Sequence, residues 1–214
     1  MKLYDYAYSS AGYRARIALN LKGIPFERSI VNLIKDGGQQ HSEAYKAINP
    51  HALIPTLVVD GTALGQSLAI IEYLDETHPM PPLLPSYPLE RARVRQIAYV
   101  IACDIHPVNN QRIRKRLKEM GHSDEDIQSK WYAHWITVGF AALEQQLSQS
   151  KETGRFCHGD TPTLADICLV PQMANAYRFK VPVDRFPTLV RIDQTCRALP
   201  AFAAAAPEKQ PDAA

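Results

Sequence analysis

Two adjacent serines, Ser9 and Ser10, stand where a short apolar run passes into a helix-like segment. The run covers residues 2–6 and the helical pattern covers residues 12–22, so the serines lie at a strand-to-helix turn. The first turn of a helix carries unpaired N–H groups and the positive end of the helix dipole. This turn is therefore predicted to bind an anion, and the same hydroxyls are also expected to cap the helix.

A second helix start has the same character. Gln66 and Ser67 precede an apolar stripe that reaches residue 76, and Ser67 is predicted to be the helix N-cap. Between the two helix starts, Pro55 suits the first position of a strand, because proline has no N–H to donate to a sheet. A cis bond there would turn the backbone N–H and C=O of Ile54 outward, toward an extended ligand. Two helix N-termini with a free strand edge between them suit a short peptide that bears carboxylates.

The elements that position these residues predict a small α/β domain. Strands are expected over residues 2–6, 26–31, 56–59 and 62–64, and helices over residues 12–22, 42–47 and 67–76. Asp60-Gly61 between the last two strands is a strong signal for a two-residue hairpin. The β-α-β start requires parallel strands, and the hairpin adds antiparallel ones. A four-stranded mixed sheet with helices is therefore predicted.

The second half of the chain differs in character. Residues 81–88, rich in proline, predict a stiff linker between a first domain at 1–80 and a second at 89–214. No later segment has a clear strand pattern, and helices are predicted over 89–120, 124–149, 163–179 and 187–199. Thr163 and Asp166 have the spacing of a helix capping box. The tail from residue 203 is expected to fray.

Composition narrows the classes of function. The formal net charge of +2 gives no reason to expect a nucleic acid or membrane surface as partner. No stretch reaches the length of a membrane span, and the N-terminus lacks the apolar core of a signal peptide. The four cysteines have neither C-x-x-C nor metal-ligand spacing, so no metal site is expected. A reduced, cytoplasmic protein with buried free thiols is the simplest prediction.

Several longer motifs add a resemblance. They are SSAGYRARIAL at 9–19, VNLIKDGGQQ at 31–40, NP at 49–50, IPTL at 54–57, QSLAIIEYL at 66–74, TPTLADICLVPQ at 161–172 and ANAYRF at 174–179. With these motifs the chain resembles, over nearly its whole length, the zeta-class glutathione transferases, which include maleylacetoacetate and maleylpyruvate isomerases. QSLAI and the capping box occur in many transferases, whereas GGQQ and ANAYRF are much narrower signals. The zeta motif usually reads Ser-Ser-Cys-Ser, so Ala11 and Gly12 depart from it.

The resemblance implies a thioredoxin-like N-terminal domain that binds glutathione, an all-α C-terminal domain and a homodimer. Ser9 is implied to face the glutathione sulfur with Ser10 beside it, and Ile54 to hold the cysteinyl backbone before a cis Pro55. Further implied glutathione contacts are Gln40, Gln66, Ser67, His106 and Asn110. Arg112 and Arg178 are implied to bind the carboxylates of a small dicarboxylate substrate. Arg114, Lys115 and Arg116 are expected instead to form a solvated basic face.

The function implied is glutathione-dependent cis–trans isomerisation of maleylacetoacetate in aromatic catabolism, by reversible thiolate addition, with Ser9, Ser10 and Arg178 as catalytic residues. The departure at Ala11 removes any protein thiol from the turn, so the sulfur must come from glutathione. Maleylpyruvate isomerase and a general glutathione transferase stay open as alternatives, as does a structural protein on the same fold. A thioredoxin-like redox protein is set aside, because no cysteine lies near Ser9.

Overall fold

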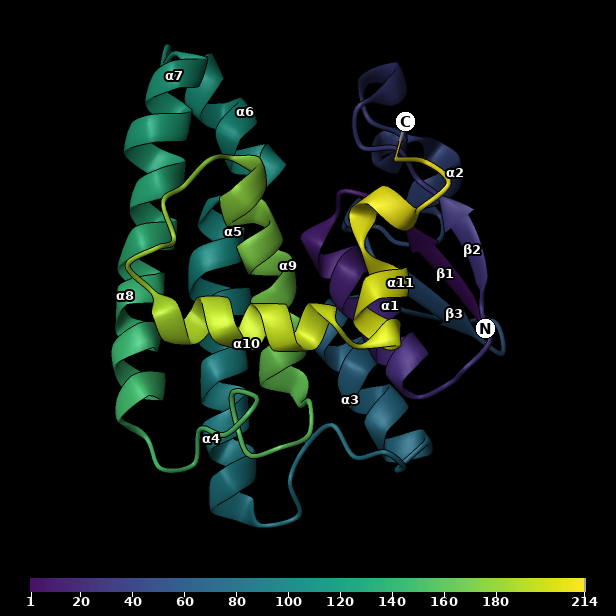
Figure 1. The fold of residues 1–214 in the computed structure, drawn as a ribbon. Helices are drawn as coiled ribbons and strands as arrows, with labels where there is room; N and C mark the ends of the chain where they lie inside the picture. Colours follow the sequence, from purple (N-terminus) through teal and green to yellow (C-terminus); the bar gives the residue numbers. More distant parts are fainter. Residues whose placement is uncertain (214) are drawn as a thin grey trace. The chain divides into compact units, whose positions relative to one another are not determined.

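The computed structural model describes residues 1–213, which form two compact units. Unit 1 comprises residues 1–82 and the described part of 198–214, and unit 2 comprises residues 83–197. The predicted division placed residues 198–214 with the helical half, and this part of the prediction is wrong. The reason is that the C-terminal helix α11 (Pro200–Ala205) packs along α1 (Ser10–Leu21) in unit 1 (Figure 1).

Unit 1 contains the predicted four-stranded mixed sheet. The strand order is β2-β1-β3-β4, with β1 and β2 parallel and the other two pairs antiparallel. Leu3 and Leu57 are fully buried partners at its centre. The strands are β1 (Lys2–Asp5), β2 (Glu27–Ile30), β3 (Thr56–Val59) and β4 (Thr62–Leu64).

The strand directions place several strand and helix ends at the same edge of the sheet. Because β3 runs antiparallel to β1, it begins at the edge where the parallel strands β1 and β2 end. Strand β4 runs antiparallel to β3 and also ends there. This edge is called the carboxyl edge below. The helices that follow β1 and β4, α1 and α3 (Ser67–Thr77), therefore both begin at the carboxyl edge, and they pack against each other.

Short elements complete unit 1. Between β2 and β3 lie two 3-10 turns, η1 (Lys35–Gly37) and η2 (Gln39–His41), and the one-turn helix α2 (Glu43–Lys46). After α11 the chain forms the 3-10 turn η5 (Pro207–Lys209). Phe202 and Ala205 are buried, and Asp212 is hydrogen-bonded to Ala7 and Arg28. The expectation that the tail frays is therefore wrong over the described residues, because it is held by specific contacts.

Unit 2 is helical, as predicted, but its first two helices are interrupted. The predicted helix 89–120 breaks at Asn109 and Asn110, where Asn110 is extended and its side chain accepts the Arg112 N–H. Asparagine side chains compete for backbone groups in this way. The elements are α4 (Pro88–Tyr99), the π-helical η3 (Val100–Ile105), α5 (His106–Val108), α6 (Gln111–Glu119), α7 (Asp124–Asp126), the π-helical η4 (Ile127–Tyr132), α8 (Ala133–Gln149), α9 (Leu164–Arg178) and α10 (Pro187–Arg197).

Helix α9 is the buried centre of unit 2, and the predicted capping box starts it. The Asp166 carboxylate accepts the Thr163 N–H at 2.8 Å and the Thr163 hydroxyl at 2.9 Å. Its other oxygen accepts the Cys157 N–H at 2.8 Å. Three cysteines are buried, as expected, but Cys103 is exposed. No helix among residues 1–213 is long and apolar enough to cross a bilayer.

Candidate functional site

The turn that ends β1 places Ser9 directly before α1. The Ser9 N–H donates to the Tyr6 carbonyl at 3.0 Å, and the Ser9 hydroxyl oxygen accepts the Gly12 N–H at 3.0 Å. Ser9 is therefore the helix N-cap, which confirms the capping expectation. A hydroxyl that accepts a bond in this way can still donate its proton to a ligand. Ser10 is the first residue of α1 and is largely buried.

A buried ion pair lies beneath this turn. Asp5, at the end of β1, is fully buried and pairs with the equally buried Arg16 of α1. Arg16 also donates to the carbonyls of Tyr6 at 3.3 Å and Ala7 at 3.0 Å. Buried charges are costly unless they are paired and hydrogen-bonded, so this arrangement fixes the turn to the first helix.

The second helix start differs from its prediction in one respect. The N-cap of α3 is Gln66, with φ 62°, and Ser67 is the first helical residue. Ser67 is buried, and its hydroxyl oxygen lies 3.5 Å from a guanidinium nitrogen of Arg14 in α1. The Ser67 hydroxyl is thus turned toward α1 rather than back onto its own helix. The left-handed backbone of Gln66 is uncommon for a residue other than glycine.

The start of β3 is held by polar side chains. The Ile54–Pro55 bond is cis, as the resemblance implied. The Leu53 carbonyl accepts bonds from the Tyr45 hydroxyl at 2.7 Å and from Asn49 at 2.9 Å. Both side chains also reach the Thr56 hydroxyl at 2.9 Å. Burial is the main cause of a raised pKa at Tyr45, so this hydroxyl stays protonated as a donor.

The GGQQ stretch folds the loop that follows β2 and positions Gln40. Gly38 has φ 104°, and a Cβ on it would lie 2.6 Å from the Gln40 side chain, so only glycine suits this position. Gln39 closes the loop by accepting the Asn32 N–H at 3.0 Å. Gln40 is buried, and its Oε1 has no hydrogen-bond partner among residues 1–213.

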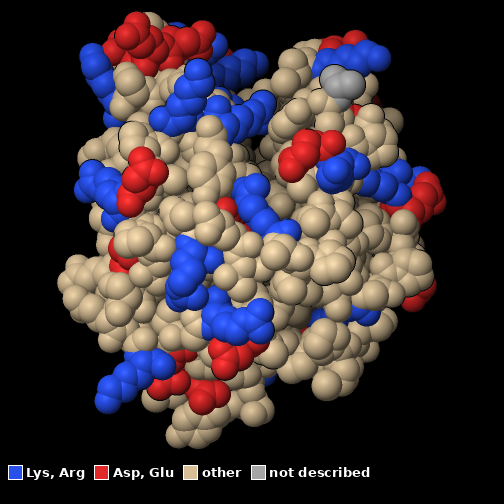
Figure 2. Space-filling model, viewed as in Figure 1, with Lys and Arg blue, Asp and Glu red and all other residues tan. Residues whose placement is uncertain are grey.

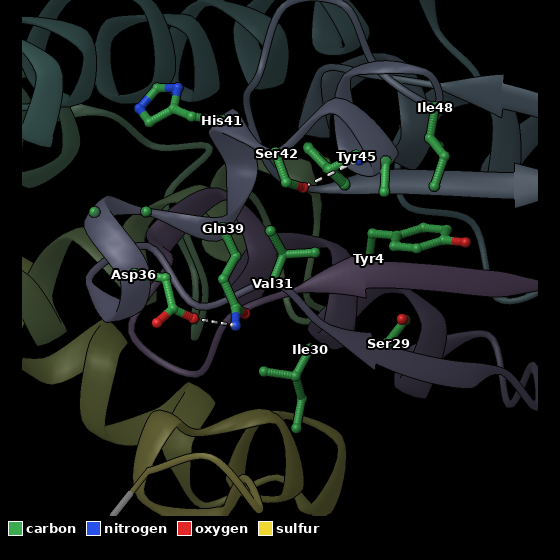
Figure 3. Close-up of a pocket in the computed structure, with 13 residues that line it drawn as sticks. Tyr4, Ser29, Ile30, Val31, Asp36, Gln39, His41, Ser42, Tyr45 and Ile48 are labelled. Carbon is green, nitrogen blue, oxygen red and sulfur yellow. Dashed lines mark hydrogen bonds between the residues drawn. The ribbon is translucent and has the colours of Figure 1, made fainter.

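A cavity of about 570 Å³ lies beside this loop, and the sequence did not predict it. Figure 3 shows Tyr4 from β1 and Val31, the residue directly after β2, in its walls, together with Gln39 from η2 and Tyr45 from α2. Hydrogen bonds from Gln39 to Asp36 and from the Tyr45 N–H to Ser42 brace the wall. Within the described chain, the residues implied to bind glutathione do not line this cavity. Gln40 comes nearest in sequence, because its neighbours Gln39 and His41 both line it.

The residues implied for unit 2 lie at or near the ends of helices. His106 begins α5, Asn110 caps α6, and Arg112 is exposed in the first turn of α6. Arg178 is the exposed last residue of α9, and its guanidinium carbon lies 5.5 Å from the centre of the Phe179 ring. His106, Asn110 and Arg112 are thus gathered within seven positions of the chain.

Arg114 does not belong to a solvated basic face, and that expectation is wrong for this residue. Its side chain is half-buried, with the guanidinium carbon 5.0 Å from the Phe179 ring centre and 5.7 Å from that of Tyr132. Burial is the main cause of a lowered pKa at Arg114. Tyr132 opposes this shift, the positive charge of Arg178 adds to it, and Asp124 opposes it more weakly. Arg114 therefore shares an aromatic surface with Arg178.

Two exposed basic residues near Arg114 pair with acidic ones instead. Arg116 pairs with Glu119 at 3.2 Å, and Lys118 pairs with Asp124 at 2.5 Å. Figure 2 shows the acidic patch over α7 bordered by basic side chains. Exposed pairs of this kind contribute little to stability. The sequence showed only a run of positive charge, because helical spacing alone does not indicate which basic side chain meets an aromatic one.

Comparisons with known proteins agree with this geometry. Residues 3–82 match the family model for the glutathione S-transferase N-terminal domain. A probable maleylacetoacetate isomerase from Vibrio cholerae is 50% identical over 212 residues, which cover 99% of this chain and 97% of the relative.

Solved structures agree as well. A holo structure of maleyl pyruvate isomerase, described as a bacterial zeta-class glutathione S-transferase, has a TM-score of 0.97 and 46% identity over the whole of both chains. A maleylacetoacetate isomerase from Methylobacterium extorquens AM1, with bound malonate and glutathione, has a TM-score of 0.95 and 41% identity, covering 99% of this chain and 98% of that one. The chain therefore belongs to the zeta class of the glutathione transferase family.

The departure of Gly12 from the usual zeta motif has a local cause. A Cβ at position 12 would lie 1.7 Å from Asp5 Oδ1 and 2.8 Å from the carboxyl carbon. Asp5 cannot move aside easily, because its other oxygen is paired with Arg16 and Arg28. The chain thus has glycine where the buried carboxylate occupies the space of a side chain.

Gly12→Ala is predicted to destabilise unit 1. In an ordinary helix, alanine is about 1 kcal/mol more favourable than glycine. Here the clash with Asp5 should reverse the sign and lower the free energy of unfolding by about 1–3 kcal/mol. Chemical denaturation checks this, with the less buried neighbour Ala11→Ser as control. A Gly12→Ala protein as stable as wild type would show that the Asp5 carboxylate can be displaced.

Proposed function

We propose that this protein is a glutathione-dependent cis–trans isomerase that converts maleylacetoacetate to fumarylacetoacetate in aromatic catabolism. The observation that carries the proposal is the convergence at the carboxyl edge. The N-termini of α1 and α3 and the start of β3 all lie at this one edge. Ser9 caps α1, Ser67 is the first residue of α3, and Ile54 lies two residues before β3. Ligands of open α/β sheets bind at such an edge, where the parallel strands end.

The residues in unit 1 suit glutathione. Two helix N-termini provide N–H donors and positive dipole ends for its carboxylates, at Gln66 and Ser67 for the γ-glutamyl group. Ile54 provides backbone groups beside a cis proline for the cysteinyl part. The buried Oε1 of Gln40 needs a donor, which an amide N–H of the tripeptide would supply.

Bound glutathione would supply a thiolate that adds reversibly to the maleyl double bond and so permits rotation about it. A free thiol has a pKa of about 8.5, so the protein must favour the ionised form at neutral pH. The Ser9 hydroxyl, with Ser10 beside it at the positive end of α1, would donate a hydrogen bond to the sulfur and favour the thiolate. A thiol of the protein itself is not required, which fits Ala11.

The substrate is a dianion, and arginine side chains suit its carboxylates. We assign this role to Arg178 and Arg112, because a planar guanidinium can form two parallel hydrogen bonds to one carboxylate. Arg178 would also stabilise negative charge that develops on the substrate during the reaction. His106 and Asn110 are assigned to glutathione, as the polar residues that begin α5 and cap α6.

One specific observation favours maleylpyruvate as the substrate instead. The relative described as maleyl pyruvate isomerase aligns over the whole of both chains with a TM-score of 0.97. The two maleyl compounds share the double bond and the carboxylate beside it, so the groups proposed above would serve either. A general glutathione transferase would bind glutathione through unit 1 in the same way but would not need the arginines assigned to the dicarboxylate. We further propose a cytoplasmic homodimer, which light scattering and cell fractionation would test.

The decisive experiment mixes the purified protein with glutathione and each maleyl substrate in turn. Glutathione-dependent loss of the cis isomer, monitored by ultraviolet absorbance, is expected with maleylacetoacetate at a higher kcat/KM than with maleylpyruvate. The reverse order would assign the second substrate. If the protein conjugates glutathione to a chlorinated aromatic electrophile but isomerises neither maleyl compound, it is a general transferase and the isomerase proposal is rejected.

Ser9→Ala is predicted to slow isomerisation by about tenfold or more, because a hydrogen bond to a charged group contributes about 1.5–3 kcal/mol. The measurement is kcat at saturating glutathione, with Ser148→Ala on the exposed face of α8 as the matched control. A Ser9→Ala enzyme with the wild-type kcat would transfer the role to Ser10 or to the backbone N–H groups.

Arg178→Ala is predicted to raise the KM for the dicarboxylate about tenfold or more while changing the KM for glutathione much less, because loss of a charged hydrogen bond to the carboxylate costs about 1.5–3 kcal/mol. Arg116→Ala, which removes an exposed guanidinium paired with Glu119, should leave both values unchanged. Steady-state kinetics with each substrate varied in turn provide the test. Equal increases in the two KM values would argue against a substrate role for Arg178.

A further inference from the structure

The C-terminal segment, residues 207–213, lies against the turn that precedes Ser9. Asp212 Oδ2 accepts the Ala7 N–H at 2.8 Å, and the Tyr8 hydroxyl donates to the Ala213 carbonyl at 2.9 Å. Both contacts join residues 205 positions apart in the sequence. The segment is therefore in direct contact with the two residues immediately before Ser9.

The hydrogen bonds of this turn are divided between two partners. Arg16 donates to the carbonyls of Tyr6 and Ala7, and the Ser9 N–H closes the turn onto Tyr6. An arginine has no acceptor, so Arg16 cannot satisfy the Ala7 N–H. Asp212 supplies the acceptor that this group needs. The Arg16 guanidinium thus binds the carbonyls of the turn, and the Asp212 carboxylate binds its Ala7 N–H.

Asp212 is itself fixed in place. Its side chain is only 7% exposed, and Oδ1 lies 2.5 Å from an Arg28 nitrogen. Arg28 in turn donates to Asp5 at 3.1 Å, so the tail joins the buried ion pair beneath the turn. Burial alone raises the Asp212 pKa, but the bonds from Arg28 and Ala7 outweigh it and leave the pKa below its ordinary value. Asp212 is therefore an anion at neutral pH.

We propose that Asp212 is a positioning residue for Ser9, and that residues 207–213 are part of the scaffold of the glutathione site. The proposal rests on the function proposed above for Ser9. Asp212 acts through the Ala7 N–H: it fixes the turn from Tyr6 to Ser9, and this turn sets where the Ser9 hydroxyl and the first N–H groups of α1 point. Displacements on the order of 1 Å at a catalytic group can cost about a hundredfold in rate.

Two variants of the full chain test the inference. Asp212→Ala removes the acceptor and the charge, whereas Asp212→Asn keeps the shape and an oxygen acceptor but loses the charge. Glu208→Ala, at an exposed position of the same segment, is the matched control. Circular dichroism and thermal denaturation show at which temperatures each variant is folded. If Asp212→Ala does not fold, the milder Asp212→Asn is used for both measurements below.

The first measurement is amide hydrogen exchange, which needs no glutathione. In Asp212→Ala, exchange over residues 6–12 is expected to rise about tenfold through local opening, while residues 67–74 of α3 keep the wild-type rate. Asp212→Asn should show a smaller increase over residues 6–12, and Glu208→Ala none. A uniform increase in both segments, or no increase in either, would overturn the positioning role.

The second measurement reports on the site itself. The ultraviolet absorbance of the thiolate gives the pKa of bound glutathione, which should be higher in Asp212→Ala than in wild type. The kcat for isomerisation should fall about tenfold, while the KM for the dicarboxylate changes less than twofold. Folded variants with wild-type thiolate absorbance and kcat would leave Asp212 a purely structural residue and overturn the proposal. A wild-type protein without thiolate absorbance would instead refute the proposed use of glutathione, and hydrogen exchange would still decide the positioning role.

Discussion

The carboxylate of Asp5 is the constraint on which the organisation of unit 1 depends. It is fully buried at the end of β1 and pairs with Arg16 from α1 and Arg28 from β2. A buried charge of this kind is tolerated only with its partners in place, so the strand, the helix and the neighbouring strand are fixed relative to one another. Through Arg28 the same network reaches Asp212 near the end of the chain.

This constraint also accounts for the local sequence at the turn. The Asp5 carboxylate occupies the space that a side chain at position 12 would need, and Arg16 donates hydrogen bonds to the carbonyls of the turn. What remains at the surface of the turn is a capping hydroxyl at Ser9 and the first N–H groups of α1. The part of the candidate site at this turn is therefore a short stretch of backbone whose position is determined by buried charges beneath it.

Much of the fold could be predicted from periodicity and turn chemistry. The hairpin around Asp60-Gly61 and the capping box at Thr163 form as predicted, because both depend on neighbours within three or four residues. The motifs likewise predicted the family, which the relatives confirm. The break at Asn109 and Asn110 was missed, because it depends on the Asn110 side chain accepting the Arg112 N–H. The role of Gln66 as cap was missed, because its left-handed backbone is uncommon for a residue other than glycine.

The sequence by itself determined the elements of the sheet, the helix starts with their hydroxyls and the absence of a thiol beside Ser9. These are local properties, set by residue type and by spacing along the chain. Only the tertiary structure decided that Arg114 lies on aromatic rings and that Asp212 holds the turn before Ser9. Contacts of this kind join residues 65 and 205 positions apart, and no local pattern encodes them, because they arise only when distant segments pack together.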